Sequence, residues 1–253
     1  MKIAIIGYGK MGQAVELAAS TAGHEIVAKI DPFFVKATKD KPKNVATEIS
    51  KETLNGAEVA IDFTHPDVVL ENIRKLAEAK VQIVVGTTGW YDSLPEVEEI
   101  VKVARVGLIY AGNFSVGVNT FYAIVEKAAQ LLTGKDFDVA LREIHHTGKA
   151  DAPSGTAREI AQKVLANFPE KKEIILDNAE QPVPADKLQI SSARIGKVVG
   201  VHEVAFDGGS DAITLTHIGK NRDGYAAGSV SAGEWLVKKG EAEVFTANDW
   251  LGF

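Results

Sequence analysis

The sequence predicts an α/β protein in which a doubly wound, parallel-sheet domain is joined to an α+β domain with a mixed sheet. In the first half of the chain, short apolar strand patterns alternate with helical patterns, which is typical of a parallel sheet covered on both faces. After residue 187, strand patterns follow one another with little helix between them, which indicates a mixed or antiparallel sheet. We therefore expect two domains that differ in architecture.

The elements of the first domain follow from apolar periodicity. We expect helices over residues 11–22, 67–79 and 95–104. The expected strands cover residues 3–6, 25–30, 58–61, 82–85 and 107–110. These runs are short and apolar throughout, as in strands that are buried on both faces.

The second domain begins with a helical pattern at 116–132, which leads into an alternating strand at 136–144. A helix follows at 154–167, residues 168–187 are expected to be irregular, and strands follow at 189–194, 198–206 and 212–218. A last helix at 225–238 is expected to return to the first domain. The expected domain bounds are 1–115, completed by 220–253, and 116–219.

The amino-acid composition argues against several classes of function. The 253 residues are 45% hydrophobic and 25% charged, which provides a core without disulfides or a structural metal. The net charge of -6 is a poor electrostatic match for nucleic acid or anionic lipid, so we expect neither partner. The absence of cysteine excludes thiolate nucleophiles and Cys-ligated zinc. No apolar run is long enough for a signal peptide or a membrane span, so we expect a cytoplasmic protein.

A glycine-rich turn links the first strand to the first helix. Its sequence, G-x-G-x-x-G, runs through Gly7, Tyr8, Gly9, Lys10, Met11 and Gly12. The first glycine allows a tight turn, the second allows close approach of a pyrophosphate, and the third allows helix and strand to pack closely. The free N–H groups at the helix start then favour phosphate. This context predicts a Rossmann-type nicotinamide site, although such a turn also occurs without a ligand.

Further cofactor contacts are expected where strands of the same sheet end. Asp31 ends the second strand, where a carboxylate accepts hydrogen bonds from the adenosine ribose. Small residues that follow the fourth and fifth strands allow the backbone to approach a nicotinamide, on which an aromatic ring at position 114 would pack. These loop residues are Gly86, Thr87, Thr88, Ala111, Gly112, Asn113 and Phe114.

The segment 143–157 carries the strongest chemical signal. His145 and His146 follow a strand, and histidine suits proton transfer near neutral pH. Lys149 adds a positive charge, and Ser154 is a candidate N-cap that leaves the N–H groups near Gly155 and Thr156 open to a carboxylate. The segment therefore favours proton transfer to a small dianionic substrate.

Two further observations bear on the role of the histidines in this segment. Adjacent strand residues face opposite ways, so two neighbouring histidines rarely act on one atom. A metal site is not expected, because the chain lacks cysteine and His145, His146 and Asp151 lack a recognised ligand spacing.

The same segment resembles the signature of dihydrodipicolinate reductases, E-x-H-H-x-x-K-x-D-A-P-S-G-T-A, and matches it at every fixed position. Further similar segments follow in the family's order over nearly the whole chain: 7–12, 61–64, 86–89, 113–119, 194–196, 200–203 and 226–228. The resemblance implies that tetrahydrodipicolinate is formed with NADH or NADPH in diaminopimelate and lysine biosynthesis. It also implies that residues 1–115 with 220–253 form the dinucleotide-binding domain, and that 116–219 form the substrate-binding domain through which a homotetramer is built.

The resemblance implies a role for each site residue. His145 is a proton donor or acceptor and His146 touches the substrate. Lys149 is a proton donor and carboxylate partner, and Gly155 with Thr156 binds the other carboxylate. Pro32 stands where some relatives carry an arginine that holds a 2′-phosphate, so we expect NADH to be preferred over NADPH.

Two alternatives remain beside the reductase. One is another Rossmann-type amino-acid dehydrogenase, such as an aspartate dehydrogenase, which would need a different substrate segment. The other is a non-catalytic nicotinamide-sensing regulator, which is expected to have lost His145 or Lys149.

Overall fold

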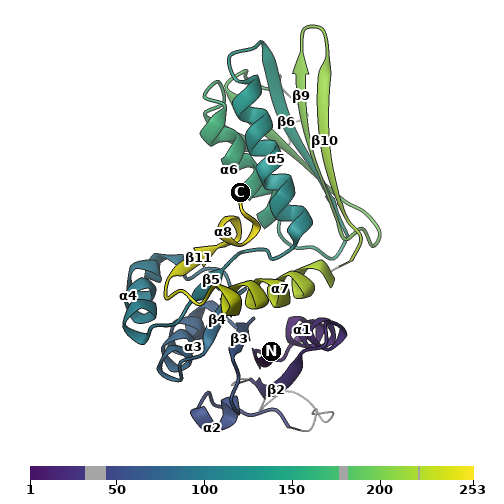
Figure 1. The fold of residues 1–253 in the computed structure, drawn as a ribbon. Coiled ribbons are helices and arrows are strands. Elements are labelled where there is room, and N and C mark those ends of the chain that lie inside the picture. Colours follow the sequence, from purple (N-terminus) through teal and green to yellow (C-terminus); the bar gives the residue numbers. More distant parts are fainter. Residues whose placement is uncertain (32–43, 177–181, 222) are drawn as a thin grey trace. The chain divides into compact units, whose positions relative to one another are not determined.

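The structure, a computed structural model, describes residues 1–31, 44–176, 182–221 and 223–253 (Figure 1). The chain forms two compact units. Unit 1 comprises Met1–Val116 and Asp223–Phe253, and unit 2 comprises Gly117–Arg222. Each unit has its own hydrophobic core, and together they form the α/β architecture with one parallel and one mixed sheet that the sequence predicts. Among the described helices, none has the length and apolar character needed to cross a bilayer.

The sheet of unit 1 has six strands, all parallel, in the order β11-β5-β4-β3-β1-β2. Five of them were expected from the sequence, whereas β11, an edge strand with two apolar residues after Glu243, was not. The bounds are β1 Lys2–Ile6, β2 Glu25–Ile30, β3 Val59–Asp62, β4 Gln82–Val85, β5 Leu108–Tyr110 and β11 Val244–Thr246.

Helices cover both faces of this sheet, which explains why its strands are apolar throughout. Neighbouring residues of β4 contribute to opposite cores, since Ile83 and Val85 lie in one cluster and Val84 in the other. On one side lie α2 Lys51–Leu54, α3 Pro66–Glu78 and α4 Leu94–Ala104, with the 3-10 helix η2 Tyr91–Ser93 before α4. On the other lie α1 Lys10–Thr21, α7 Asp223–Lys239 and α8 Ala247–Leu251.

Helix α7 packs closely on the loop that follows β5. A Cβ atom added at Gly228 would lie 1.7 Å from the carbonyl oxygen of Phe114, so no other residue fits there without a backbone shift. The ring of Phe114 is only 1% exposed and lies 6.2 Å from the ring of Trp250 on α8. The C-terminal helices thereby fix the loop at the end of β5.

Unit 2 contains a five-stranded mixed sheet in the order β10-β9-β6-β8-β7. Strand β6 is its centre, antiparallel to β9 and parallel to β8. Helices α5 and α6 supply the apolar cluster on one face. The bounds are α5 Val116–Leu132, β6 Phe137–His145, α6 Gly155–Asn167, β7 Glu173–Leu176, β8 Lys187–Arg194, β9 Gly200–Gly208 and β10 Ala212–Gly219.

Strand β7 corrects one expectation. We expected residues 168–187 to be irregular, but Glu173–Leu176 pairs in parallel with Lys187–Ile190 of β8. Four residues with two half-exposed side chains give no clear alternation, and edge pairing with β8 stabilises the strand instead.

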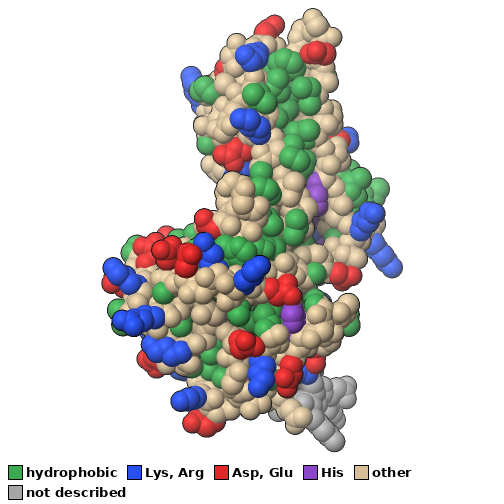
Figure 2. Space-filling view, viewed as in Figure 1, with side chains coloured by type: hydrophobic (Ala, Val, Ile, Leu, Met, Phe, Trp, Pro, Cys, Tyr) green, Lys and Arg blue, Asp and Glu red, His purple; other side chains and the backbone are tan. Residues whose placement is uncertain are grey.

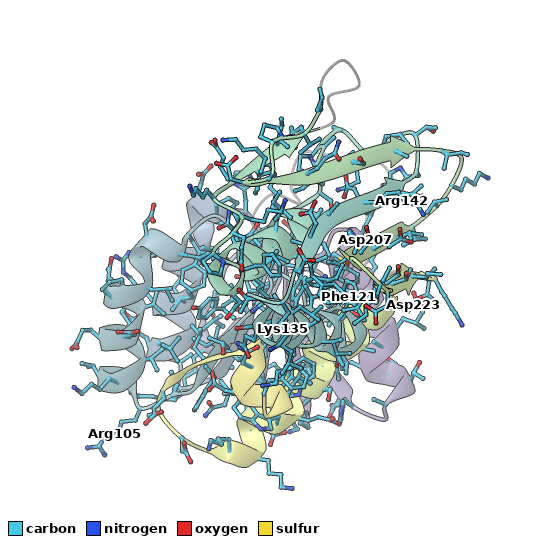
Figure 3. All side chains as sticks on the ribbon, turned by 90° about the horizontal axis from the view of Figure 1, so that it is seen from above. Arg105, Phe121, Lys135, Arg142, Asp207 and Asp223 are labelled. Atoms are coloured by element: carbon cyan, nitrogen blue, oxygen red, sulfur yellow. The ribbon has the colours of Figure 1, made fainter. Side chains whose placement is uncertain are left out.

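The second face of this sheet carries polar and small side chains together with a group of apolar cross-strand neighbours, Ile144, Val201 and Ile218. Arg142 of β6 lies opposite Glu203 of β9, and their side chains form an ion pair at 3.3 Å. Figure 3 labels Arg142 of β6 and Asp207 of β9. On the edge strand β10, Ile218 is 63% exposed.

Surface charge in unit 1 is mixed in sign. Figure 2 shows Lys and Arg side chains among Asp and Glu side chains on its visible face.

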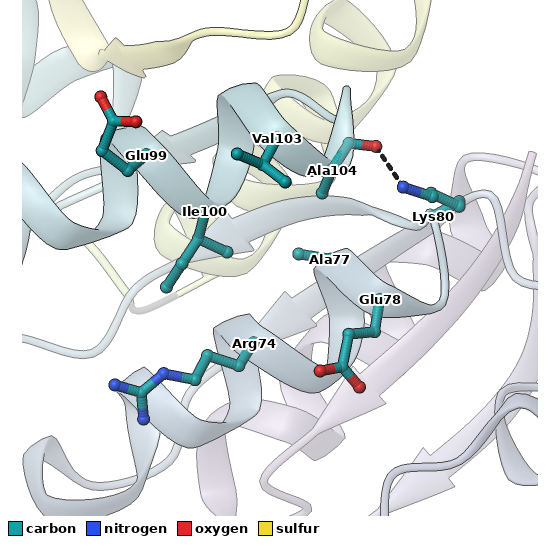
Figure 4. A pocket seen from close by; sticks show the side chains of 8 residues that line it. All are labelled: Arg74, Ala77, Glu78, Lys80, Glu99, Ile100, Val103 and Ala104. Atoms are coloured by element: carbon teal, nitrogen blue, oxygen red, sulfur yellow. Dashed lines mark hydrogen bonds between the residues drawn. The ribbon is translucent and has the colours of Figure 1, made fainter.

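A pocket of about 430 Å³ lies between the C-terminal ends of α3 and α4 (Figure 4). Lys80 closes one end by donating to the carbonyl of Ala104 at 2.7 Å. Helices of a doubly wound fold run antiparallel to the strands, so this pocket lies toward the amino ends of the strands. Ligands of such folds bind at the carboxyl ends of the strands, so a cofactor is expected at the opposite edge of the sheet.

Candidate functional site

The glycine loop between β1 and α1 has the geometry of an anion site. Gly7 has a φ of +85°, and a Cβ there would lie 2.5 Å from the carbonyl oxygen of Phe63. A Cβ at Gly12 would lie 2.2 Å from the oxygen of Gly7, so both positions exclude a side chain. At Gly9 nothing lies within 4 Å of an added Cβ, which leaves space above the loop. The loop lies where β1 separates β2 from β3, the point at which the strand order reverses.

The start of α1 is open to a phosphate. Gly9 is the N-cap and makes no side-chain cap bond, and the first turn of the helix contains no acidic residue. The first N–H groups of the helix and its positive dipole end therefore remain available for an anion. The residues at this turn fit the pyrophosphate of a nicotinamide dinucleotide.

Asp31 lies beside the glycine loop. Its Oδ2 accepts a hydrogen bond of 2.9 Å from the backbone N–H of Tyr8. The side chain of Tyr8 is turned away from the loop's outer surface, since its buried hydroxyl contacts Glu16 and Lys29. Tyr8 can therefore offer only its backbone to a cofactor. Pro32, which we considered for cofactor choice, lies outside the described residues.

A buried carboxylate organises the loops after β3 and β4. Asp62 Oδ1 accepts from the Thr64 N–H (2.8 Å), the Thr64 hydroxyl (2.6 Å) and the Thr87 hydroxyl (3.1 Å). Its Oδ2 accepts from the amide of Asn72 at 2.9 Å. Burial raises the pKa of Asp62, against the opposing effect of these hydrogen bonds. The hydroxyl of Thr87 is thus part of this hydrogen-bond network. The role of Asp62 was not predicted from the sequence.

The loops after β4 and β5 lie next to each other. A Cβ at Gly112 would be 3.7 Å from the methyl group of Thr88, and one at Gly86 would collide with the Phe63 ring at 2.0 Å. Asn113 is 9% exposed, and its side-chain oxygen accepts from the N–H of Ser115. The Phe114 ring, which we expected to pack on a nicotinamide, lies inside the core and presents no face to a ligand.

In unit 2, β6 places Glu143 and His145 on one buried face, two residues apart in a strand. His202 on β9 is the direct cross-strand partner of Glu143. The Nε2 atom of His145 lies 3.3 Å from Nε2 of His202 and 3.4 Å from Oε2 of Glu143. The sheet register therefore assembles a cluster of three buried titratable side chains.

Glu143 connects three elements. Its carboxylate accepts from the Ser192 hydroxyl (2.9 Å) and from the Arg194 guanidinium (2.9 Å) on β8. Both of its oxygens also lie within 3.2 Å of the Ser154 N–H, at the start of α6. Burial raises the pKa of Glu143, but the hydrogen bonds from Ser154, Arg194 and Ser192 outweigh burial and lower it. The carboxylate is therefore charged and holds α6 against the sheet.

Both histidines of the cluster are neutral near neutral pH. Burial lowers the pKa of His145, against the opposing effects of Glu143 and of its bond to Val199. Burial also lowers the pKa of His202, to about 4. Because the Val199 carbonyl accepts from Nδ1 of His145 at 2.9 Å, the proton of neutral His145 lies on Nδ1, and Nε2 carries the lone pair.

The turn after β6 places the remaining residues of the segment. His146 lies just beyond the strand and is half-buried, and its carbonyl accepts from the N–H of Lys149. The Lys149 ammonium forms an ion pair of 2.7 Å with Asp151, and its side chain is 22% exposed. The strand includes His145, so alternation separates its side chain from that of Ile144, whereas His146 is positioned by the turn.

The N-terminus of α6 has the features of a carboxylate cradle. The Ser154 hydroxyl caps the helix by accepting from the N–H of Ala157 at 3.2 Å. Gly155 is exposed, with nothing within 4 Å of an added Cβ, and Thr156 is half-buried. The first turn contains no acidic residue. Backbone N–H groups and a hydroxyl are thus open to an anion in this short stretch.

Sequence reasoning missed three members of this site: the carboxylate of Glu143, the guanidinium of Arg194 and the ring of His202. Alternation along β6 signals that residues 143 and 145 share a face. Arg194 and His202 join the site because β6 pairs with β8 and β9, and a single sequence does not reveal this pairing.

Comparisons with known proteins cover both units. Residues 1–114 match the family described as "Dihydrodipicolinate reductase, N-terminus", and residues 117–251 match "Dihydrodipicolinate reductase, C-terminus". A 4-hydroxy-tetrahydrodipicolinate reductase of Christiangramia forsetii is 37% identical over 99% of this chain and 98% of its own. One of Staphylococcus haemolyticus is 33% identical over 94% of this chain and 96% of its own.

A solved structure agrees. The dipicolinate-bound dihydrodipicolinate reductase from Paenisporosarcina sp. TG-14 is 25% identical, with a TM-score of 0.80 and 98% of each chain covered. Sequence and fold therefore agree over nearly the full length of the chain.

Proposed function

The chain belongs to the dihydrodipicolinate reductase family, and from that premise we propose which of its residues reduce 4-hydroxy-tetrahydrodipicolinate to tetrahydrodipicolinate in diaminopimelate and lysine biosynthesis. The observation that carries the proposal is segment 143–157, in which His145 at the end of β6, the ammonium group of Lys149 and the carboxylate cradle of α6 follow one another closely. Neither an aspartate dehydrogenase nor a non-catalytic regulator is favoured, because the relatives are named as this reductase and His145 and Lys149 are both present.

The reaction requires loss of water, a hydride at C4 and a proton at C3. A nicotinamide cofactor supplies the hydride when bound. We assign its pyrophosphate to residues 7–12, its ribose to Asp31, and its remaining contacts to 86–88 and 111–114, where Phe114 contributes only its backbone because its ring is buried. Gly155 and Thr156 bind one substrate carboxylate, Lys149 pairs with the other, and His146 contacts the substrate from the turn.

Hydride arrival at C4 moves negative charge toward C3, so a proton source at C3 lowers the barrier. Lys149 carries its proton on a partly exposed ammonium. Neutral His145 gives its single N–H to Val199. We therefore assign proton donation to Lys149, and to His145 a supporting acid–base role that begins when substrate displaces the Val199 contact. The decisive assay follows oxidation of NADH and NADPH with freshly generated hydroxytetrahydrodipicolinate, and no oxidation of either cofactor would refute the assignment.

The carboxylate cradle gives a binding prediction. Thr156→Val keeps the side chain's shape and removes its hydroxyl, so pyridine-2,6-dicarboxylate should bind more weakly by about 1–3 kcal/mol. Lys149→Ala should also weaken this inhibitor, because a charged partner is lost. Isothermal titration calorimetry with the inhibitor, and separately with NADH, measures both effects. Unchanged inhibitor affinity in both variants would remove the cradle from the substrate site, whereas a parallel loss of NADH affinity would indicate a folding defect.

Cofactor preference depends on Asp31. We propose that NADH is preferred, with appreciable use of NADPH, because the Asp31 carboxylate repels a 2′-phosphate. Asp31→Asn removes the charge and retains an oxygen for the Tyr8 N–H, so the NADPH-to-NADH ratio of kcat/KM should rise roughly tenfold, equivalent to about 1.4 kcal/mol. Asp31→Ala should shift the ratio in the same direction with some loss for both cofactors. An unchanged ratio in the two variants would exclude Asp31 from the ribose site.

We propose a homotetramer built through unit 2. On the face of its sheet opposite α5 and α6, Ile144, Val201 and Ile218 are cross-strand neighbours, and Ile218 on the edge strand β10 is 63% exposed. Light scattering on the purified protein should give four times the 27.1 kDa chain mass. A monomer mass at micromolar concentration would contradict the proposal.

A further inference from the structure

We propose that Glu143, His145 and His202 form a Zn²⁺ site in unit 2 and that zinc bound there inhibits the reductase. The inhibition, though not the binding, rests on the role assigned above to His145. The three residues are buried, and one ligand atom of each lies within 4.8 Å of the other two.

The spacing of the ligand atoms fits a tetrahedral ion. His145 Nε2, His202 Nε2 and Glu143 Oε2 are separated by 3.3, 3.4 and 3.8 Å. A circle through three atoms with these separations has a radius of about 2.0 Å, and Zn–N and Zn–O bonds are about 2.0–2.2 Å long. An ion slightly out of their plane therefore reaches all three atoms with almost no movement of the side chains.

The two imidazole rings are also oriented for one ion. Two histidines bound through Nε2 to one tetrahedral zinc have ring centres about 5 Å apart, from the bond length and the tetrahedral angle. The rings of His145 and His202 have centres 5.1 Å apart and are inclined by 69°. The separation of the ring centres and that of the two Nε2 atoms therefore agree with binding of one ion by both rings.

Contacts behind the ligands support the site. Metal-binding histidines usually donate their second N–H to a carbonyl or carboxylate, which fixes the tautomer. Nδ1 of His145 makes this bond to Val199 at 2.9 Å, which leaves Nε2 as the lone-pair atom. On Glu143, Ser192 and Arg194 donate to Oε1, and the Ser154 N–H lies within 3.2 Å of both oxygens. The Ser154 hydroxyl lies 3.1 Å from Nε2 of His202, and zinc would displace this contact.

The donor set selects the metal. Two imidazoles and one carboxylate suit Zn²⁺, whereas Mg²⁺ and Ca²⁺ prefer oxygen ligands in larger number. A water molecule takes the fourth position. Two features weaken the affinity: the Arg194 guanidinium adds positive charge on the far side of Glu143, and His202 Nδ1 has no partner among the described residues, so its N–H needs a water when zinc is bound.

Sequence spacing does not reveal this site. From the sequence, we did not expect His145, His146 and Asp151 to bind a metal. The structure instead joins His145 to Glu143 within one strand and to His202 from a strand more than fifty residues later. His146 is thus a natural control, since it neighbours His145 in sequence but does not belong to the cluster.

Binding is tested with Co²⁺, which reports its coordination by visible absorption. Tag-free protein, freed of metal by a chelator that is then removed, is titrated with Co²⁺ and then with Zn²⁺. We expect the intense visible bands of four-coordinate Co²⁺ at one equivalent per chain, and their loss when Zn²⁺ is added. Weak bands typical of six-coordinate Co²⁺, or none, would overturn the site.

Variants separate the cluster from surface binding. His145→Gln and His202→Gln should each weaken Co²⁺ and Zn²⁺ binding by at least about tenfold, whereas His146→Gln should bind as the parent does. Circular dichroism melts show whether each variant is folded, and the two ligand variants are independent of each other. Equal zinc affinity in folded forms of both variants would disprove the proposal.

Inhibition is measured separately, at saturating NADH and with substrate concentrations low enough that chelation of zinc by the dicarboxylate is negligible. Zinc should lower the rate of the parent enzyme reversibly, with chelator restoring it, whereas Mg²⁺ should not. If zinc binds but the rate of NADH oxidation is unchanged, the proposed inhibition is wrong and the proposed binding site is still supported. If the metal-free enzyme does not reduce the substrate at all, the proposed function fails while the Co²⁺ result remains valid.

Discussion

Lys149→Met should lower kcat by about 10²–10⁴-fold, the range that general acid catalysis usually supplies. Methionine keeps the length and apolar stem of the side chain and removes its transferable proton. His145→Gln should have a smaller effect, because the neutral imidazole gives its N–H to Val199 and its Nε2 lies against His202. Steady-state kcat and KM for both variants, with NADH at saturation, test this order.

His146→Gln is the matched control for the adjacent histidine. Since His146 lies in the turn beyond β6, we expect its loss to raise KM more than it lowers kcat, as for a residue that binds substrate and transition state alike. If His145→Gln proves the more damaging variant and Lys149→Met turns over near the parent rate, the proton comes from His145 and our assignment is reversed.

Gly228→Ala should destabilise unit 1 by about 2–4 kcal/mol, a large fraction of the stability of a typical domain. The new methyl group would lie 1.7 Å from the Phe114 carbonyl, so helix α7 or the loop after β5 must shift. Equilibrium unfolding in urea, followed by circular dichroism, measures the loss. Affinity for NADH should fall as well, because the displaced loop carries proposed cofactor contacts.

Gly233→Ala on the same helix is the control. Its added Cβ meets side chains of Val59, Met1 and Val84 at 3.5–3.6 Å, which is ordinary van der Waals contact. Alanine also has the higher helix propensity, so this variant should be neutral or more stable by up to about 1 kcal/mol. If the two variants have the same stability, the close approach of α7 to Phe114 is not what holds the loop.

The fold was largely predictable because its buried elements repeat a simple pattern. Five apolar strands of unit 1 and the helices between them are visible in the sequence, and so is the change to successive strands in unit 2. Strands β7 and β11 were not visible, because both are short edge strands whose few apolar residues follow charged ones, Glu173 and Glu243. Their stability comes from pairing with β8 and β5, which are distant in sequence.

The site was predictable only where its residues are adjacent in the chain. The glycine loop and segment 143–157 each combine backbone geometry and side chains within a few residues. The Asp62 network and the Glu143–His202 pairing depend on sheet register, which a single sequence does not determine. Likewise, nothing local indicates that the Phe114 ring is buried, since Trp250 comes from the far end of the chain.

The late position of α7 has a consequence for synthesis on the ribosome. Unit 2 is one continuous segment, so it can fold as soon as residue 222 has left the exit tunnel. The N-terminal strands, made first, must wait for residues 223–253 to cover the sheet face that carries Ile3, Val59 and Val84. During that interval the nascent chain exposes an apolar sheet, a surface that is prone to aggregation. A stalled chain that ends before residue 223 should therefore be protease-sensitive in its first hundred residues and resistant in the second.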